Sequence, residues 1–229
     1  MYSVTTVVYL SAMSTTDDLR SIPLLASLDT PTLADTARRV RHCSFRPGQH
    51  ILTEGEQAPG LFFVLRGRVR LSRTAADGRE QVLAMIGPGE PFDPAPLFDD
   101  GPNPSSARAM SPVTCLLLSR EDLLALISRH PGLALSMLSS MAGQLRDLVG
   151  LVEDLAFRTV RARMARHLLA EAPGGAADLT QQELAERAGT VREIAGRALR
   201  RLAQEGLVRL ERGRVIVLDP TGLAHVIEE

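Results

Sequence analysis

The chain contains no lysine and no tryptophan, and it has few aromatic residues and only two cysteines. Without lysine it cannot form a lysine Schiff base or supply the lysine of a P-loop. Aromatic residues make up 3% of the 229 residues, so the core must be built from Leu, Val, Ala and Met. Cys43 and Cys115 are too few for an iron–sulfur cluster, which usually needs four thiolates. Nothing in the sequence supports a disulfide between them.

The sequence also lacks the patterns of a secretory signal and of a membrane span. No basic segment precedes the short apolar run near the N-terminus. No stretch approaches the ~20 apolar residues that cross a bilayer. We therefore expect a cytoplasmic protein that does not bind membranes. The net charge is −1, so any binding of nucleic acid must come from local charge.

Residues 179–207 carry the most informative pattern, which predicts two helices joined by a tight turn. Thr180 precedes Glu183 by three residues, and Thr190 precedes Glu193 by the same spacing. In a capping box the threonine hydroxyl accepts the N–H of the third residue, whose side chain reaches back. Two capped helices with a glycine before the second cap predict a helix-turn-helix, which places its second helix in the major groove of DNA.

The second helix of this motif, expected from Val191 to Glu205, should bury one face and expose arginines on the other. The expected core positions are Ile194, Ala195, Ala198, Leu199 and Leu202. Arg192, Glu193 and Arg197 remain outside, near the helix start that reaches base edges in this motif. Arginine forks onto guanine O6 and N7, and a carboxylate accepts from cytosine N4. These three residues are therefore our candidates for reading a half-site that contains G·C pairs.

Other residues of the motif are expected to hold the DNA backbone. They are Thr180, Gln181, Thr190, Arg200, Arg201 and Arg212. Between positions 187 and 214 there are eight arginines and three glutamates, a balance of +5. Two alternatives stay open: the arginines could form only a solvated helix face, and Glu193 could serve only as a helix cap.

A long helix is predicted upstream, from about residue 133 to residue 156. Its apolar residues are spaced by 3, 4, 3, 4 and 3 positions, which is the heptad seam of a coiled coil. The seam consists of Leu138, Met141, Leu145, Leu148, Val152 and Leu155. A helix buried in its own domain would need a wider apolar stripe. The narrow stripe favours a homodimer, since two-fold symmetry is also the commonest assembly.

The remaining segments complete an α+β organisation. Residues 18–40 read as a helix, and residues 45–118 read as short antiparallel strands punctuated by glycines, typical of a sandwich or barrel. Val69 and Leu71 alternate with polar neighbours, as in a half-buried strand. Ser119 and Asp122 have cap spacing before another helix. A further helix is expected from Thr159 to Leu169, and strands at 207–210 and 215–218 should form a wing.

This order of elements resembles the cyclic-AMP receptor protein and fumarate–nitrate regulator (Crp/Fnr) family of bacterial transcription factors. The resemblance covers about residues 20–220 and rests on three segments: RPGQHILTEGEQAPGLFFVLRGRVRL, LVEDLAFRTVRARMARHLL and VREIAGRAL. It implies a β-roll of the cyclic-nucleotide-binding type (a double-stranded β-helix), a dimerisation helix and a winged helix-turn-helix. The expected domains are an N-terminal tail (1–18), the β-roll (19–131), the dimer helix (132–158) and the DNA-binding domain (159–229).

The resemblance further implies a DNA site. The family's arginine–glutamate–arginine triple corresponds to Arg192, Glu193 and Arg197, which implies a palindrome with TGTGA-like half-sites. The implied partners are double-stranded DNA, a second copy of the chain and RNA polymerase.

The cyclic-nucleotide cassette of the family is altered here. The family has Phe-Gly-Glu and then an arginine before a small-residue stretch, whereas this chain reads Pro91-Phe92-Asp93-Pro94. Pro94 occupies the place of the ribose-binding glutamate. Asn103 stands near the place of the phosphate-binding arginine, and Arg108 matches a later arginine outside that contact. We therefore expect no binding of cyclic AMP and no bound cofactor or metal.

The effector, if there is one, is left open by the sequence. In the dimer helix, Leu148 and Val149 replace the polar pair that touches the nucleotide base. The candidate pocket residues are Phe92, Asp93, Arg108, Leu148 and Val149. Alternatives are an apolar ligand beside Leu148 and Val149, no effector at all, thiol sensing by Cys43, or haem. Haem ligands would come from His42, Cys43, His50 and Cys115.

Two functions of other classes fit the sequence less well than a DNA-binding regulator does. An enzyme on a β-roll or cupin-like scaffold would need clustered histidines and carboxylates, yet the five histidines are scattered and no catalytic dyad is recognisable. A regulatory subunit that binds partners through the β-roll would leave the helix-turn-helix without a role. The sequence therefore predicts a regulator that is not an enzyme.

Overall fold

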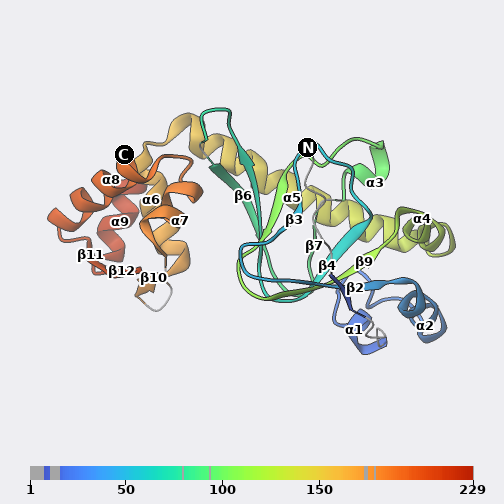
Figure 1. Ribbon diagram of the computed structural model, residues 1–229. Helices are drawn as coiled ribbons and strands as arrows, with labels where there is room; N and C mark the ends of the chain where they lie inside the picture. Colours follow the sequence, from blue (N-terminus) through green and yellow to red (C-terminus); the bar gives the residue numbers. More distant parts are fainter. Residues whose placement is uncertain are drawn as a thin grey trace. The chain divides into compact units, whose positions relative to one another are not determined.

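The computed structural model describes residues 8–10, 16–78, 80–92, 94–172, 175–177 and 179–228 (Figure 1). The chain divides into two compact units. The first consists of residues 1–72 and 84–144, and the second of residues 73–83 and 145–229. The predicted α+β class is confirmed, with antiparallel sheets first and a helix-turn-helix last.

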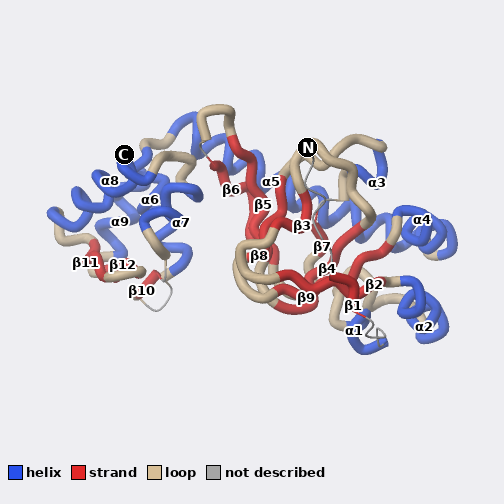
Figure 2. The backbone as a smooth tube through the Cα atoms, in the orientation of Figure 1, coloured by secondary structure: helices blue, strands red, loops and turns tan. Residues whose placement is uncertain are grey.

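Two antiparallel sheets contain the strands of the first unit, and the end of β5 and the start of β6 fall in residues 73–83 of the second (Figure 2). One sheet contains, in spatial order, β1 (Val8–Leu10), β2 (Arg41–Phe45), β9 (Val113–Leu118), β4 (Leu61–Arg66) and β7 (Pro91–Phe92). The other contains β3 (His50–Leu52), β8 (Ser106–Ala109), β5 (Val69–Thr74) and β6 (Glu80–Ile86). Phe62 and Phe92 stack in the core with ring centroids 5.3 Å apart. Of the expected N-terminal tail, residues 1–7 and 11–15 lie outside the described residues.

The first part of β5 is buried on both faces, which corrects the half-buried pattern expected from its alternation. Val69 is fully buried, but Arg70 and Ser72 on the opposite face are also less than a tenth exposed. Alternation of apolar and polar residues therefore does not identify a solvent face in this part of the strand.

The single helix expected over residues 18–40 is in fact two helices. They are α1 (Thr16–Arg20) and α2 (Thr30–Arg39), separated by consecutive turns. Pro23 lies in that interval, and proline disfavours helical conformation in the residue before it and clashes within a helix. The second helix starts again at Asp29, whose side chain accepts the N–H of Thr32 at 2.8 Å.

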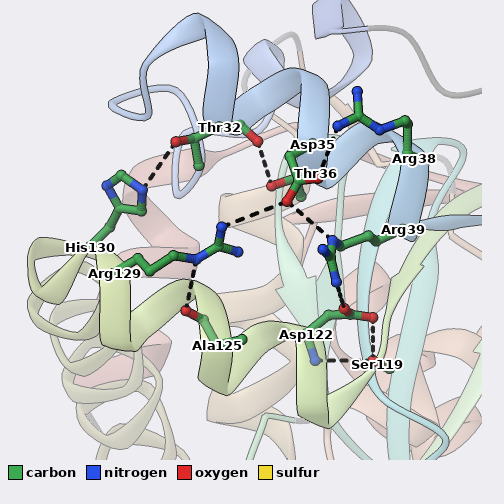
Figure 3. Close-up of polar contacts among 10 residues, drawn as sticks. All are labelled: Thr32, Asp35, Thr36, Arg38, Arg39, Ser119, Asp122, Ala125, Arg129 and His130. Atoms are coloured by element: carbon green, nitrogen blue, oxygen red, sulfur yellow. Dashed lines mark hydrogen bonds and ion pairs between the residues drawn. The ribbon is translucent and has the colours of Figure 1, made fainter.

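A polar network joins α2 to α4 (Arg120–Arg129) in the first unit (Figure 3). Arg39 donates to Asp122 at 2.9 Å and to Asp35 at 3.1 Å, and Arg129 also lies within 3.7 Å of Asp35. The predicted cap of α4 is confirmed, since Ser119 Oγ accepts the N–H of Asp122 at 3.1 Å. The remaining helix here is the short α3 (Pro96–Asp99).

The long helix predicted upstream of the DNA-binding motif is confirmed as α5 (Pro131–Phe157), which passes from the first unit into the second at residue 145. The second unit continues with α6 (Val160–Glu171), α7 (Gln181–Arg187), α8 (Arg192–Gln204) and α9 (Pro220–Glu228). Its small sheet has the order β10 (Ala176–Ala177), β12 (Arg214–Val217) and β11 (Val208–Glu211). The helix α6 packs against α8 and α9 around an aliphatic core. The expected wing hairpin is thus present.

Candidate nucleic-acid interface

The first helix of the motif begins with the predicted capping box. Thr180 Oγ1 accepts the N–H of Glu183 at 3.2 Å, and Glu183 Oε2 accepts the N–H of Thr180 at 2.8 Å. The helix α7 ends at a turn in which Gly189 has φ +62°, a left-handed conformation that favours glycine. The turn therefore redirects the chain from α7 into α8 as the sequence predicts.

The second predicted capping box is wrong. The N-cap of α8 is Val191, whose side chain makes no capping hydrogen bond. The N–H of Thr190 already donates to Ala185 O at 2.9 Å, so that N–H is not free to hold a phosphate. Glu193 is consequently not engaged as a helix cap, which leaves its carboxylate available for another contact.

The buried face of α8 is formed by Ala195, Leu199 and Leu202, as expected. Ala198 is half-buried, and the expectation that Ile194 lies in the core is wrong, because this side chain is 38% exposed. At ~100° per residue Ile194 lies at the edge of the apolar stripe, beside Arg197 and Arg201 rather than over the core.

The base-reading candidates have no partner within the described part of the chain. Arg192, Glu193, Arg197 and Arg200 are all exposed, and no hydrogen bond or ion pair engages their side chains among the residues that the structure describes. Nearby arginines differ: Arg201 pairs with Glu205 at 3.3 Å. An unpaired charged side chain loses no intramolecular contact when it binds a base or a phosphate.

These side chains surround an open groove of about 530 Å³ on α8. Its lining residues are Gln181, Arg192, Glu193, Gly196, Arg197 and Arg200. Gly196 was not singled out from the sequence, although glycine inside a helix costs ~1 kcal/mol relative to alanine and so signals a packing or functional role. A Cβ at Gly196 would lie 3.4 Å from Gln181 Oε1, which is ordinary van der Waals contact with the end of a flexible side chain.

A second groove of about 450 Å³ lies between the capping box and the wing. Thr180, Gln181, Arg192 and Arg212 are among its lining residues, so four of the expected DNA contacts meet there. Glu211 on the wing is engaged by Arg214 at 2.6 Å, and this hydrogen bond keeps the pKa of the Glu211 carboxyl below its usual value. Arg212 at the tip of the wing is exposed.

The seam of α5 is largely uncovered in the single chain. Leu138, Leu145, Leu148, Val152 and Leu155 are between 40% and 65% exposed, and Met141 is half-buried. The sequence pattern missed the neighbouring Leu135, Val149 and Phe157, which are exposed as well. Contiguous exposed apolar side chains of this kind mark candidate interaction surfaces.

The effector candidates fall in both units. Phe92 is fully buried in the core of the first unit, and Arg108 Nε donates to Gly48 O at 2.9 Å on β8. Leu148 and Val149 belong to the second unit. Asp93 lies outside the described residues. Phe92 is thus a packing residue rather than a pocket wall.

The haem and thiol candidates are mostly interior. Cys43 and Cys115 lie opposite each other on β2 and β9, both buried and not disulfide-bonded. Burial raises the pKa of the Cys43 thiol to about 11 and also raises that of Cys115, which keeps both unreactive. His42 is buried, whereas His50 is exposed. Among the described residues, no group of three or more His, Cys, Asp and Glu side chains could hold a metal ion.

In the part of the chain that the structure describes, no helix is long and apolar enough to cross a membrane.

Comparison with known proteins adds family relationships to this geometry. Residues 42–130 match the cyclic nucleotide-binding domain, and residues 162–226 match the Crp-like helix-turn-helix domain. The chain is 32% identical over 212 residues to the CRP-like cAMP-activated global transcriptional regulator of Mycobacterium tuberculosis, covering 88% of this chain and 95% of that protein. It is 40% identical over 182 residues to the cyclic AMP receptor protein of Thermus thermophilus, covering 78% and 84%.

Among solved structures, the chain is similar in fold to a transcriptional regulator of the Crp/Fnr family from Eubacterium rectale. The TM-score is 0.80 at 21% identity, and the match covers 92% of this chain and all of that one.

Proposed function

Because the chain belongs to the Crp/Fnr family of transcription regulators, we propose that it acts as a homodimer that reads a palindromic DNA site. The observation that carries the proposal is the outward row of Arg192, Glu193 and Arg197 at the start of α8, charged, exposed and unpaired among the described residues. Guanidinium groups suit guanine and a carboxylate suits cytosine, so we expect G·C pairs in each half-site, as in TGTGA.

The exposed seam of α5 supports the homodimer. Its spacing matches a two-stranded coiled coil, and pairing with a second copy would cover the apolar stripe. A two-fold dimer places two reading helices about one helical turn of DNA apart, which is why the expected site is a palindrome. RNA polymerase is the protein partner that this role implies.

We further propose that cyclic AMP is not required for DNA binding, although the two relatives above are described as cAMP-activated or as a cyclic AMP receptor. Asn103, near the place of the phosphate-binding arginine, is used inside the protein. Its side chain donates to Thr53 O at 3.2 Å, its N–H donates to Glu56 O, and its carbonyl accepts from Gly55. The residue thus closes a turn instead of presenting a positive charge.

Selection of bound duplexes from a random pool, with and without cyclic AMP, tests the proposal. We expect one palindrome to emerge in both cases, with affinity that falls as salt rises. Arg192→Ala or Arg197→Ala should cost ~1–3 kcal/mol and relax specificity at one base pair. Arg200→Ala should weaken binding to all sequences alike, and Arg38→Ala in the first unit is the matched control.

Equal losses from the base-reading and backbone variants would contradict the assignment of roles. Selection that succeeds only with cyclic AMP, together with tight uptake of cyclic AMP in calorimetry, would overturn the independence from this nucleotide. Selection that returns no common site under either condition would overturn the proposed function itself.

A further inference from the structure

Two exposed apolar side chains lie at the start of α8, and the DNA contacts proposed so far do not involve them. Val191 and Ile194 are each 38% exposed, whereas the apolar residues on the opposite face of α8 are buried. Residues three apart on a helix are neighbours, so Val191, Ile194 and Arg197 follow one another in a row. The row continues the surface that carries Arg192 and Glu193.

Val191 also occupies a position that usually holds a capping residue. Its backbone is extended (φ −89°, ψ 152°), its carbonyl accepts the N–H of Ile194 at 3.0 Å, and its side chain makes no cap hydrogen bond. Ser, Thr, Asn or Asp are preferred at this position, and valine is among the least favoured residues. Proteins depart from such local preferences mainly at functional sites. The unfavourable N-cap residue of α8 therefore indicates a contribution to DNA binding.

The major groove offers one apolar group to such side chains, the C5-methyl of thymine. We propose that Val191 and Ile194 contact thymine methyl groups next to the G·C pairs read by Arg192 and Arg197, and so determine specificity for T·A at those positions. This inference rests on the proposed function. It predicts that the half-site has thymines flanking its guanines, with specificity from apolar contact as well as from hydrogen bonds.

The test removes the methyl groups from the DNA instead of changing the protein. In the selected palindrome, each thymine is replaced in turn, in both half-sites, by deoxyuridine, which lacks only the methyl group. Affinity of the full-length protein is measured by fluorescence anisotropy at fixed salt. Burial of a methyl group corresponds to about four-fold in affinity, so loss from both half-sites should raise Kd about fifteen-fold at each contacted position.

Val191→Ala and Ile194→Ala identify which side chain reads which methyl. Each variant should bind the thymine duplex about fifteen-fold more weakly and lose its sensitivity to deoxyuridine at one position. Leu218→Ala, which shortens another exposed apolar side chain of the second unit, is the matched control and should keep full sensitivity. Because all three side chains are exposed, these variants should fold normally, which circular dichroism checks.

Three results would overturn the inference. The first is a selected half-site without thymine beside its guanines. The second is unchanged Kd for every deoxyuridine substitution while Arg192→Ala still weakens binding, which would leave the proposed function intact. The third is full sensitivity to deoxyuridine in both alanine variants, which would mean that another group reads the methyls. If no common site is selected at all, the proposed function fails and this inference falls with it.

Discussion

Replacement of Asp154 by alanine should loosen the junction between α5 and the helices α6 and α9 that follow it. The Asp154 carboxylate is 7% exposed near the end of α5 and accepts from Arg158 at 2.9 Å and from Arg166 of α6. Arg158 in turn donates to Ile227 O at 3.0 Å. Arg163 donates to Arg158 O at 2.8 Å and to Ala188 O at 2.7 Å, which connects the junction to the turn of the motif.

The size of the stability loss depends on how well water can hydrate Arg158 and Arg166 once the carboxylate is removed. Removal of one member of a fully buried ion pair costs ~3–5 kcal/mol because the other charge is left unpaired. Here the side chains of Arg158 and Arg166 are 30% and 48% exposed, so water can hydrate them after the carboxylate is lost. We therefore expect Asp154→Ala to lower the local stability of α6 by about 2 kcal/mol, less than the fully buried case.

Hydrogen exchange measured by mass spectrometry provides the assay, because it reports local opening even when the two units unfold separately. A loss of about 2 kcal/mol corresponds to roughly 30-fold faster exchange in the peptides of α6. Asp154→Asn should lie between alanine and the unchanged protein. Glu211→Ala, which removes the ion pairs of Glu211 with Arg209 and Arg214 on the wing, should leave α6 unaffected. Unchanged exchange in α6 after Asp154→Ala would show that the Asp154 ion pairs do not stabilise this helix.

Two further predictions concern assembly and pH. Leu145→Asp should convert the dimer to a monomer in sedimentation velocity without loss of helix content, whereas Arg146→Asp, off the seam, should remain dimeric; a dimeric Leu145→Asp would count against the seam. Burial and then the neighbouring Arg187 lower the pKa of His167, whose Nε2 lies 3.1 Å from Arg187 O. The folded pKa is therefore below the unfolded value of ~6.5, so the free energy of unfolding should fall as pH drops below that value. His167→Gln should flatten this dependence in thermal unfolding between pH 7.5 and 5.5, and an unaltered slope would exclude His167 as its source.

Sequence patterns correctly predicted the structural features that depend only on residues close together in the chain. The caps at Thr180 and Ser119 depend on residues three positions apart, and both were found as predicted. The wing and the long helix also follow from local patterns, a turn glycine between strands and an unbroken apolar repeat. Such features need no knowledge of distant parts of the chain.

The wrong predictions concern features that depend on the tertiary packing or on competing local interactions. The alternation in β5 predicts that Arg70 and Ser72 face solvent, yet both are buried. Thr190 has the spacing of a cap, yet its N–H donates to Ala185 O, and the N-cap of α8 is Val191, one residue later. The apolar spacing over residues 18–40 predicts one helix, but Pro23 lies in the interval where the structure has two separate helices.

Residue identity and spacing along the chain were enough to predict the family, the α+β class and the arginine–glutamate–arginine triple. Which of the charged side chains are free depends instead on how the chain packs. The tertiary structure shows Arg192, Glu193 and Arg197 without partners among the described residues, while Arg201 and Arg214 are engaged by nearby glutamates. It also shows that Val191 and Ile194 are exposed at the start of α8. Exposure and pairing are properties of the packed chain, and spacing cannot reveal them.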